Sequence, residues 1–295
     1  MLARAITHVE NGSDLGKQIS NELVAQSSKG FVIGITGPPG AGKSTLVDRL
    51  IGSYRRQGLK VGVIAVDPSS PFSHGAILGD RIRMLQSTED EGVFIRSMAT
   101  RGHLGGLNSV IFETLNLYRA FGFDRIIVET VGAGQSEVDV MKYCQTTVVV
   151  SVPGLGDGVQ ILKAGILEIA DIFVVNKSDL TGAEQIRFQI KNLLNLIPEE
   201  RAWTPPVLAL SAINTEGIDD LVDSVDSHHE YLVTSGEGES KVLTQIGETL
   251  LSEVQGLVEK KLRRRLLEEY SNEILLSKLK FDDAVTKLVE EMTNE

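Results

Sequence analysis

The chain has 295 residues, of which 29 are basic and 40 acidic, so its formal net charge at pH 7 is −11. This acidic balance argues against a protein that binds nucleic acid without sequence preference, or one held on anionic lipid by charge alone. The single cysteine, Cys144, excludes an intramolecular disulfide and a cysteine cluster for zinc or an iron–sulfur centre. Since no apolar run has membrane-spanning length and no targeting segment is visible, we expect a cytoplasmic protein that binds neither membrane nor nucleic acid.

The predicted elements begin with a helix in residues 1–29, where Leu15, Ile19 and Leu23 recur every four residues after Ser13, a candidate N-cap. From Gly30 onward, short β-rich runs alternate with helix-length segments. The predicted strands are 31–36, 61–66, 125–130, 147–152, 172–176 and 207–210. This alternation predicts an α/β fold with a mainly parallel sheet flanked by helices, over residues 30–234. Ligands of such a sheet bind at the carboxyl ends of its strands.

Two patterns predict element boundaries in the second half of the chain. Thr181 and Glu184 have the spacing of a capping box, in which each side chain satisfies a free amide of the other's backbone. Residues 235–240 are small, polar and glycine-bearing, and predict a linker. Beyond it, apolar residues recur at steps of three and four, so residues 241–295 are expected to form a helical arm. A second copy of the chain or the main domain could cover that apolar stripe, and we expect a homodimer.

A sequence of the form G-x-x-x-x-G-K-[ST] follows the first predicted strand and precedes a predicted helix, as in a phosphate-binding loop. It consists of Gly37, Pro38, Pro39, Gly40, Ala41, Gly42, Lys43 and Ser44. Its glycines let backbone N–H groups turn toward a β-phosphate, and the helix N-terminus adds its positive end. We expect Lys43 to neutralise phosphate charge, Ser44 to give its hydroxyl to Mg²⁺, and Thr45 to contact the α-phosphate.

A second motif, N-K-x-D, follows the predicted strand at 172–176 and indicates which base is bound. A carboxylate at Asp179 can accept from both N1–H and the 2-amino group of guanine, whereas adenine would leave it unpaired. Asn176 is expected to brace the loop, and the aliphatic stem of Lys177 to lie along the base. After the next strand, Ser211 and Ala212 resemble the loop whose backbone amide reads guanine O6. The expected ligands are therefore GTP and GDP.

Three acidic residues at or beyond predicted strand ends are candidates for Mg²⁺, namely Asp67, Asp80 and Glu129. A strand-end cap is the alternative role for Asp67, and a helix N-cap for Asp80. Glu129 begins a sequence similar to the D-x-x-G motif of GTPases, in which Gly132 offers its N–H to the γ-phosphate. Because phosphoryl transfer requires mainly positioning and charge neutralisation, we expect these carboxylates and Lys43 to be the catalytic groups. No water-positioning side chain can be named.

Seven segments together resemble the family of methylmalonyl-CoA-mutase-associated GTPases, of the signal-recognition-particle-like class and once labelled arginine/ornithine transport ATPases. They are residues 37–44, 67–71, 79–84, 129–137, 153–157, 163–171 and 176–179. The resemblance implies a homodimer that uses GTP hydrolysis to gate adenosylcobalamin loading and to protect or reactivate an acyl-CoA mutase. It further implies that this protein acts on adenosylcobalamin only through that mutase, and that an adenosyltransferase is a candidate partner. In the family, residues 153–163 correspond to a switch loop that couples nucleotide state to the mutase.

Two alternative functions remain open. Nickel- or cobalt-insertion GTPases for hydrogenase and urease share this class, but they use cysteine and histidine ligands near the switches. Here Cys144 stands alone, and the adjacent pair His228 and His229 is expected to face solvent. A P-loop kinase of a transport system would follow the older label, and the N-K-x-D motif argues against its use of ATP.

Overall fold

The computed structural model describes residues 1–23, 30–68, 90–100, 106–130, 141–154, 166–196 and 202–265, together with residues 283 and 286. In chain order, its elements are α1 (Leu2–Glu10), α2 (Asp14–Leu23), β1 (Phe31–Thr36), α3 (Lys43–Arg56), β2 (Val61–Pro68), β3 (Val93–Thr100), α4 (Gly106–Ala120), β4 (Arg125–Thr130), β5 (Thr146–Ser151), α6 (Ile166–Ile169), β6 (Ile172–Val175), α7 (Ala183–Asn195), β7 (Val207–Ala209), α8 (Ile218–Ser235) and α9 (Glu237–Arg265).

The strands of the described residues form one seven-stranded sheet with the order β3-β2-β4-β1-β5-β6-β7. Every neighbouring pair is parallel, so all carboxyl ends lie along the same edge. Strands β1, β5 and β6 are buried along their whole length, as expected for apolar runs covered on both faces. The predicted fold class, a parallel sheet flanked by helices, is confirmed.

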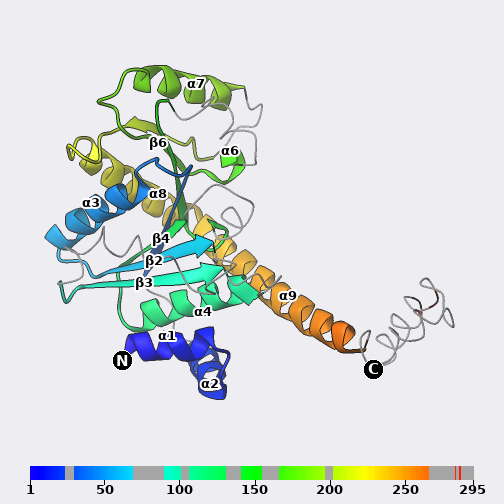
Figure 1. Cartoon of the computed structure of the whole chain (residues 1–295). Helices are drawn as coiled ribbons and strands as arrows, with labels where there is room; N and C mark the ends of the chain where they lie inside the picture. Colours follow the sequence, from blue (N-terminus) through cyan, green and yellow to red (C-terminus); the bar gives the residue numbers. More distant parts are fainter. Residues whose placement is uncertain are drawn as a thin grey trace.

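The helices cover both faces of this sheet (Figure 1). Helices α3 and α8 share one apolar cluster with the residues of β1, β5 and β6 that point to their side. On the other face, α1 and α4 enclose a second cluster, and α7 covers a third over β5, β6 and β7. Helix α9 begins against the sheet and then projects away from it as a long arm (Figure 1). No helix in the described ranges is long and apolar enough to cross a membrane.

The N-terminal segment contains the predicted helix and one more. Helix α2 begins after Ser13, whose Oγ accepts a hydrogen bond from Gly16 N at 3.1 Å, so the predicted N-cap is confirmed. Helix α1 precedes it and buries Leu2, Ile6 and Val9 against the sheet's α4 face. Its apolar residues recur at steps of four and three, which is a helical spacing, but the prediction for this segment rested only on the residues of α2.

Two predicted boundaries differ from the structure, and one strand was missed. The capping box is wrong: α7 begins at Ala183 with Gly182 as its N-cap, and Glu184 pairs instead with Arg187 at 2.8 Å. Gly182, and not Thr181, is the N-cap residue. Its φ of 95° lies in the left-handed region, which glycine adopts readily. The predicted linker at residues 235–240 is reduced to Gly236, which ends α8 at a φ of 77°. Helix α9 starts immediately afterward. Strand β3, at one edge of the sheet, was not predicted.

Candidate nucleotide-binding site

The glycine-rich loop joins the carboxyl end of β1 to the first turn of α3, at the centre of the sheet. Gly37 has a φ of 147°, and a Cβ placed there would lie 2.2 Å from Val150 O in the neighbouring strand. Gly42 has a φ of 82° and is the N-cap of α3; a Cβ there would lie 2.5 Å from Asn176 Nδ2. Backbone conformation and close packing therefore both require glycine at these two positions.

Lys43 is the first residue of α3, and its side chain is only 6% exposed. Its Nζ donates to Gly37 O at 2.8 Å and to Pro38 O at 3.1 Å, so the ammonium group lies over the loop. The helix N-terminus adds partial positive charge at the same place. This arrangement concentrates positive potential at the loop, as an anionic phosphate chain requires.

Glu129 lies on β4, the neighbour of β1, and is almost completely buried. Its Oε1 accepts a hydrogen bond of 2.7 Å from Ser44 Oγ in the first turn of α3. Beside it, Thr130 Oγ1 donates to Thr36 Oγ1 at 3.1 Å, which ties the ends of β4 and β1 together. The structure thus brings two oxygen-bearing side chains together next to the glycine-rich loop. Thr45, the next residue, is exposed.

Of the other two acidic candidates, the structure describes the backbone of Asp67 but not Asp80. Asp67 is the second-last residue of β2 and pairs with Ala99 of β3. Strand β2 lies next to β4, on the side away from β1. Its backbone therefore ends on the same edge of the sheet as Glu129. Asp80 and Gly132 lie outside the described residues, as does the predicted switch loop beyond Gly154.

Asn176 joins three loops at the carboxyl end of β6. Its Nδ2 donates to Ala41 O at 2.8 Å in the glycine-rich loop. Its Oδ1 accepts from Lys177 N at 2.8 Å and from Ala212 N at 3.0 Å in the loop after β7. Because the side chain is 2% exposed, all three bonds are shielded from water. Asn176 braces the loops in the manner that the sequence predicts.

Asp179, in the loop after β6, and Ser211, after β7, lie in contact with each other. Ser211 Oγ donates to Asp179 Oδ1 at 2.6 Å, and Ser211 is fully buried whereas Asp179 is exposed. The hydroxyl therefore fixes one oxygen of a carboxylate that remains open to a ligand. Lys177 has a φ of 58°, and its Nζ donates to Gly40 O at 2.9 Å, so its stem spans from the N-K-x-D loop to the glycine-rich loop.

The sequence motifs did not reveal three residues that fix these loops and strand ends through hydrogen bonds. Arg49, in the second turn of α3, donates from Nε to Ala212 O at 3.0 Å. Thr36 and Thr130 fasten the two central strands at their carboxyl ends. Arg49 and Thr36 belong to no motif used above, Thr130 occupies a variable position of the D-x-x-G-like sequence, and the contacts join positions far apart in sequence. Only the position of Arg49 one or two turns after the glycine-rich loop could have suggested that it faces the site.

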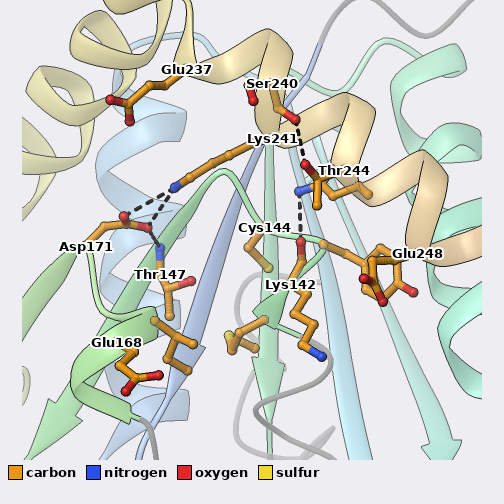
Figure 2. Close-up of a pocket in the computed structure, with 14 residues that line it drawn as sticks. Lys142, Cys144, Thr147, Glu168, Asp171, Glu237, Ser240, Lys241, Thr244 and Glu248 are labelled. Atoms are coloured by element: carbon orange, nitrogen blue, oxygen red, sulfur yellow. Dashed lines mark hydrogen bonds and ion pairs between the residues drawn. The ribbon is translucent and has the colours of Figure 1, made fainter.

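A separate pocket of about 650 Å³ lies at the opposite, amino-terminal edge of the sheet, beneath the start of α9 (Figure 2). There Asp171 accepts hydrogen bonds from Thr147 N at 2.8 Å and from Lys241 Nζ at 3.3 Å (Figure 2). Burial raises the pKa of Asp171, and the Lys241 ammonium opposes that rise. Burial likewise raises the pKa of the Cys144 thiol, which keeps it protonated. These contacts fasten α9 to the sheet.

His228 contributes to the same fastening from α8, contrary to the prediction that it faces solvent. It is 1% exposed, its Nδ1 lies 2.7 Å from Thr146 Oγ1, and its Nε2 lies 3.3 Å from Asp171 Oδ1. Burial lowers its pKa to about 3, so the ring is neutral at physiological pH. In the described part of the chain, no group of three or more histidine, cysteine, aspartate or glutamate side chains could hold a metal ion.

Comparison with known proteins decides the family. A sequence model of "Methylmalonyl Co-A mutase-associated GTPase MeaB" matches residues 2–268. The chain belongs to the MeaB family. It is a GTPase, with the P-loop GTPase fold and the GTP-hydrolysing activity after which its relatives are named.

Relatives of this MeaB-family chain occur in organisms as different as Pyrococcus abyssi and mouse. A putative GTPase of Pyrococcus abyssi is 49% identical over 259 residues, which cover 87% of this chain and 80% of that protein. The mouse mitochondrial "Methylmalonic aciduria type A homolog" is 35% identical over 83% of this chain and 63% of its own length. The crystal structure of a "LAO/AO transport system kinase" has a TM-score of 0.75 and 29% identity, covering 99% of this chain and 92% of that one.

Proposed function

We propose that this MeaB-family GTPase uses GTP hydrolysis to gate the loading of adenosylcobalamin into an acyl-CoA mutase and to protect or reactivate that mutase. The observation that carries the proposal is the match of residues 2–268 to a family named for its association with methylmalonyl-CoA mutase. Similarity to the methylmalonic aciduria protein of mouse supports it. In this account adenosylcobalamin is bound by the mutase, and an adenosyltransferase is a further candidate partner.

We assign the phosphates of GTP to the loop from Gly37 to Gly42 and the first turn of α3. Lys43 now donates to two carbonyl oxygens of the loop, and a phosphate chain would offer its ammonium stronger, charged acceptors. Ser44 and Thr45 follow at the helix N-terminus, and Thr45, which is exposed, would contact the α-phosphate. These residues neutralise the charge that develops during phosphoryl transfer.

The donor set beside this loop fits Mg²⁺. Ser44 Oγ and Glu129 Oε1 are 2.7 Å apart, and hydroxyl and carboxylate oxygens are the ligands that Mg²⁺ prefers. Asp67, at the adjacent strand end, and Asp80 complete the proposed set. When bound, Mg²⁺ would supply positive charge that offsets the negative charge of the phosphates. Glu129 would hold the ion's position from buried β4, and Gly132, three residues later in the chain, would sense the γ-phosphate.

We assign the guanine base to the loops after β6 and β7. Asp179 would accept from N1–H and the 2-amino group of the base, with its carboxylate oriented by Ser211. The stem of Lys177 would cover one face of the base, since its ends are fixed on two loops. A backbone amide next to Ala212 would read O6. Adenine would leave the Asp179 carboxylate unpaired, and this favours GTP over the ATP that a transport kinase would use.

We further propose that the chain forms a homodimer through α9. Leu243, Leu250, Val254 and Leu257 are each more than half exposed and recur at helical spacing along the arm. Ile246, between them, instead packs against the main domain. Docking on the chain's own domain therefore accounts for only part of the apolar stripe, and a second copy would cover the rest.

The proposal is tested by reconstituting cofactor loading. An apo acyl-CoA mutase from the same organism is mixed with this protein and with adenosylcobalamin on its adenosyltransferase, in the presence of GTP or a nonhydrolysable GTP analogue. Mutase activity should appear with GTP and be withheld with the analogue. Loading at the same rate with either nucleotide, or without this protein, would contradict the gating role.

A further inference from the structure

Arg49 connects the helix of the phosphate loop to the loop that is proposed to read the base. Its Nε donates to Ala212 O at 3.0 Å, across 163 positions of sequence. The nearby carboxylate of Asp48 lies 3.9 Å from Arg49 Nη1, too far for a good hydrogen bond. The Arg49 side chain is 37% exposed, so it is only partly in contact with water. A charged side chain on α3 therefore donates a hydrogen bond to one backbone carbonyl of the loop after β7.

That loop is held closed at its base. Ser211 and Glu216 exchange two backbone hydrogen bonds, of 3.0 and 3.1 Å, which close a tight turn between them. The N–H of Ala212 donates to Asn176 Oδ1 at 3.0 Å. Because the Asn176 side chain and the Arg49 side chain hold opposite sides of residue 212, the orientation of the following peptide is determined as well.

The Ala212–Ile213 peptide is a planar trans unit, so its C=O and its N–H point in opposite directions. A guanidinium bonded to the C=O fixes the plane of this unit and polarises it, which strengthens the N–H of Ile213 as a donor. In the described residues, no acceptor contacts that N–H. It is thus a free, oriented donor one residue beyond Ala212, whose own N–H is occupied.

We propose that Arg49 is a positioning residue for base recognition, which holds and polarises the Ala212–Ile213 peptide so that the Ile213 N–H donates to the 6-oxo group of guanine. This inference rests on the proposed guanine site and deepens it. It assigns the selection of the 6-oxo group to an arginine on the phosphate-loop helix, alongside the selection of the 2-amino group by Asp179.

The test compares nucleotides that differ only in the base, bound to the full-length protein. GDP and IDP both carry the 6-oxo group, whereas 2-aminopurine riboside 5′-diphosphate lacks it. Each nucleotide displaces a fluorescent GDP analogue, and dissociation constants are measured up to millimolar concentration. Arg49→Met should weaken GDP and IDP by about tenfold, as loss of a charge-assisted contact predicts, and leave the 2-aminopurine nucleotide unchanged. Arg49→Lys should restore part of the loss.

Arg56→Met is the matched control, because Arg56 lies on the same helix, is largely exposed, and contacts Asp219 rather than the base loop. It should change none of the three affinities. If Arg49→Met weakens all three nucleotides by the same factor, Arg49 has only a structural role and the inference is wrong; no change in any of them also overturns it. A wild-type protein that binds ADP as tightly as GDP would instead overturn the proposed guanine site itself.

Discussion

Replacing Asp179 by Asn tests the base assignment at the residue that we propose reads the base. In the structure Ser211 Oγ donates to Asp179 Oδ1 at 2.6 Å, and an asparagine Oδ1 can accept the same bond. This bond would direct the new amide N–H₂ toward the base. It would then oppose the N1–H and the 2-amino group of guanine, but it would match the 2-oxo group of xanthine.

The magnitude follows from two lost hydrogen bonds to a charged acceptor. Each such bond contributes about 1.5–3 kcal/mol, and the exposure of Asp179 places the sum near the lower end, at about 3 kcal/mol or about 150-fold in affinity. We therefore expect Asp179→Asn to bind GDP about 150-fold more weakly and to bind XDP more tightly than the wild type does. Competition of GDP and XDP against a fluorescent nucleotide measures both changes.

Ser211→Ala is the control for this experiment, because it keeps the carboxylate but removes the group that orients it. It should weaken GDP by only about fivefold, as loss of one hydrogen bond predicts, and should gain no affinity for XDP. If Asp179→Asn leaves the ratio of GDP to XDP affinity unchanged, the carboxylate does not read the base and the reasoning is refuted.

Four further predictions concern other parts of the molecule. Glu129→Gln should lower the GTP hydrolysis rate by at least about tenfold while changing GTP affinity less, and steady-state kinetics with parallel binding measurements would expose an equal loss of both. Gly37→Ala should lower the free energy of unfolding by at least about 2 kcal/mol, because its Cβ would lie 2.2 Å from Val150 O; a denaturant midpoint equal to that of the wild type would contradict this. Leu250→Glu should give a monomer by light scattering that still binds GTP, and a persistent dimer would place the interface away from α9. Acidification from pH 6.5 toward 3 should lower stability, since His228 takes up a proton in the unfolded state near 6.5 but only near 3 when folded; His228→Gln should reduce this slope by up to about 1.4 kcal/mol per pH unit in denaturant titrations, and an unchanged slope would argue against a neutral buried ring.

The sequence predicted the central strands and the loops that follow them, because their signals are local. Each strand is a short apolar run, and the glycine-rich and N-K-x-D motifs lie directly at strand ends. Strand β3 has a weaker signal, since Arg96 interrupts its apolar residues. In the fold Arg96 pairs with Glu10 of α1, so a helix distant in sequence makes this charged residue acceptable within the strand. Such a pairing cannot be read from either segment alone.

Contacts that join distant residues explain the other differences. His228 looked like half of an exposed pair, but the ring of Trp203 packs against it with centroids 4.7 Å apart, and it shares the carboxylate of Asp171 with Lys241 of α9. The bond from Arg49 to Ala212 O likewise depends on how α3 packs beside the loop after β7. The motifs therefore predict residues that the fold brings together at the strand ends, but they do not predict the residues, such as Arg49, that hydrogen-bond to the backbone of those loops.

The most direct test of the account is the rate of GTP hydrolysis by this protein, measured with increasing concentrations of a purified adenosylcobalamin-dependent acyl-CoA mutase from the same organism. A GTPase that gates cofactor loading must respond to its client, so the account predicts a hydrolysis rate that rises with mutase concentration and then saturates. A rate that stays the same at every mutase concentration, with every acyl-CoA mutase of that organism, would contradict the proposed function.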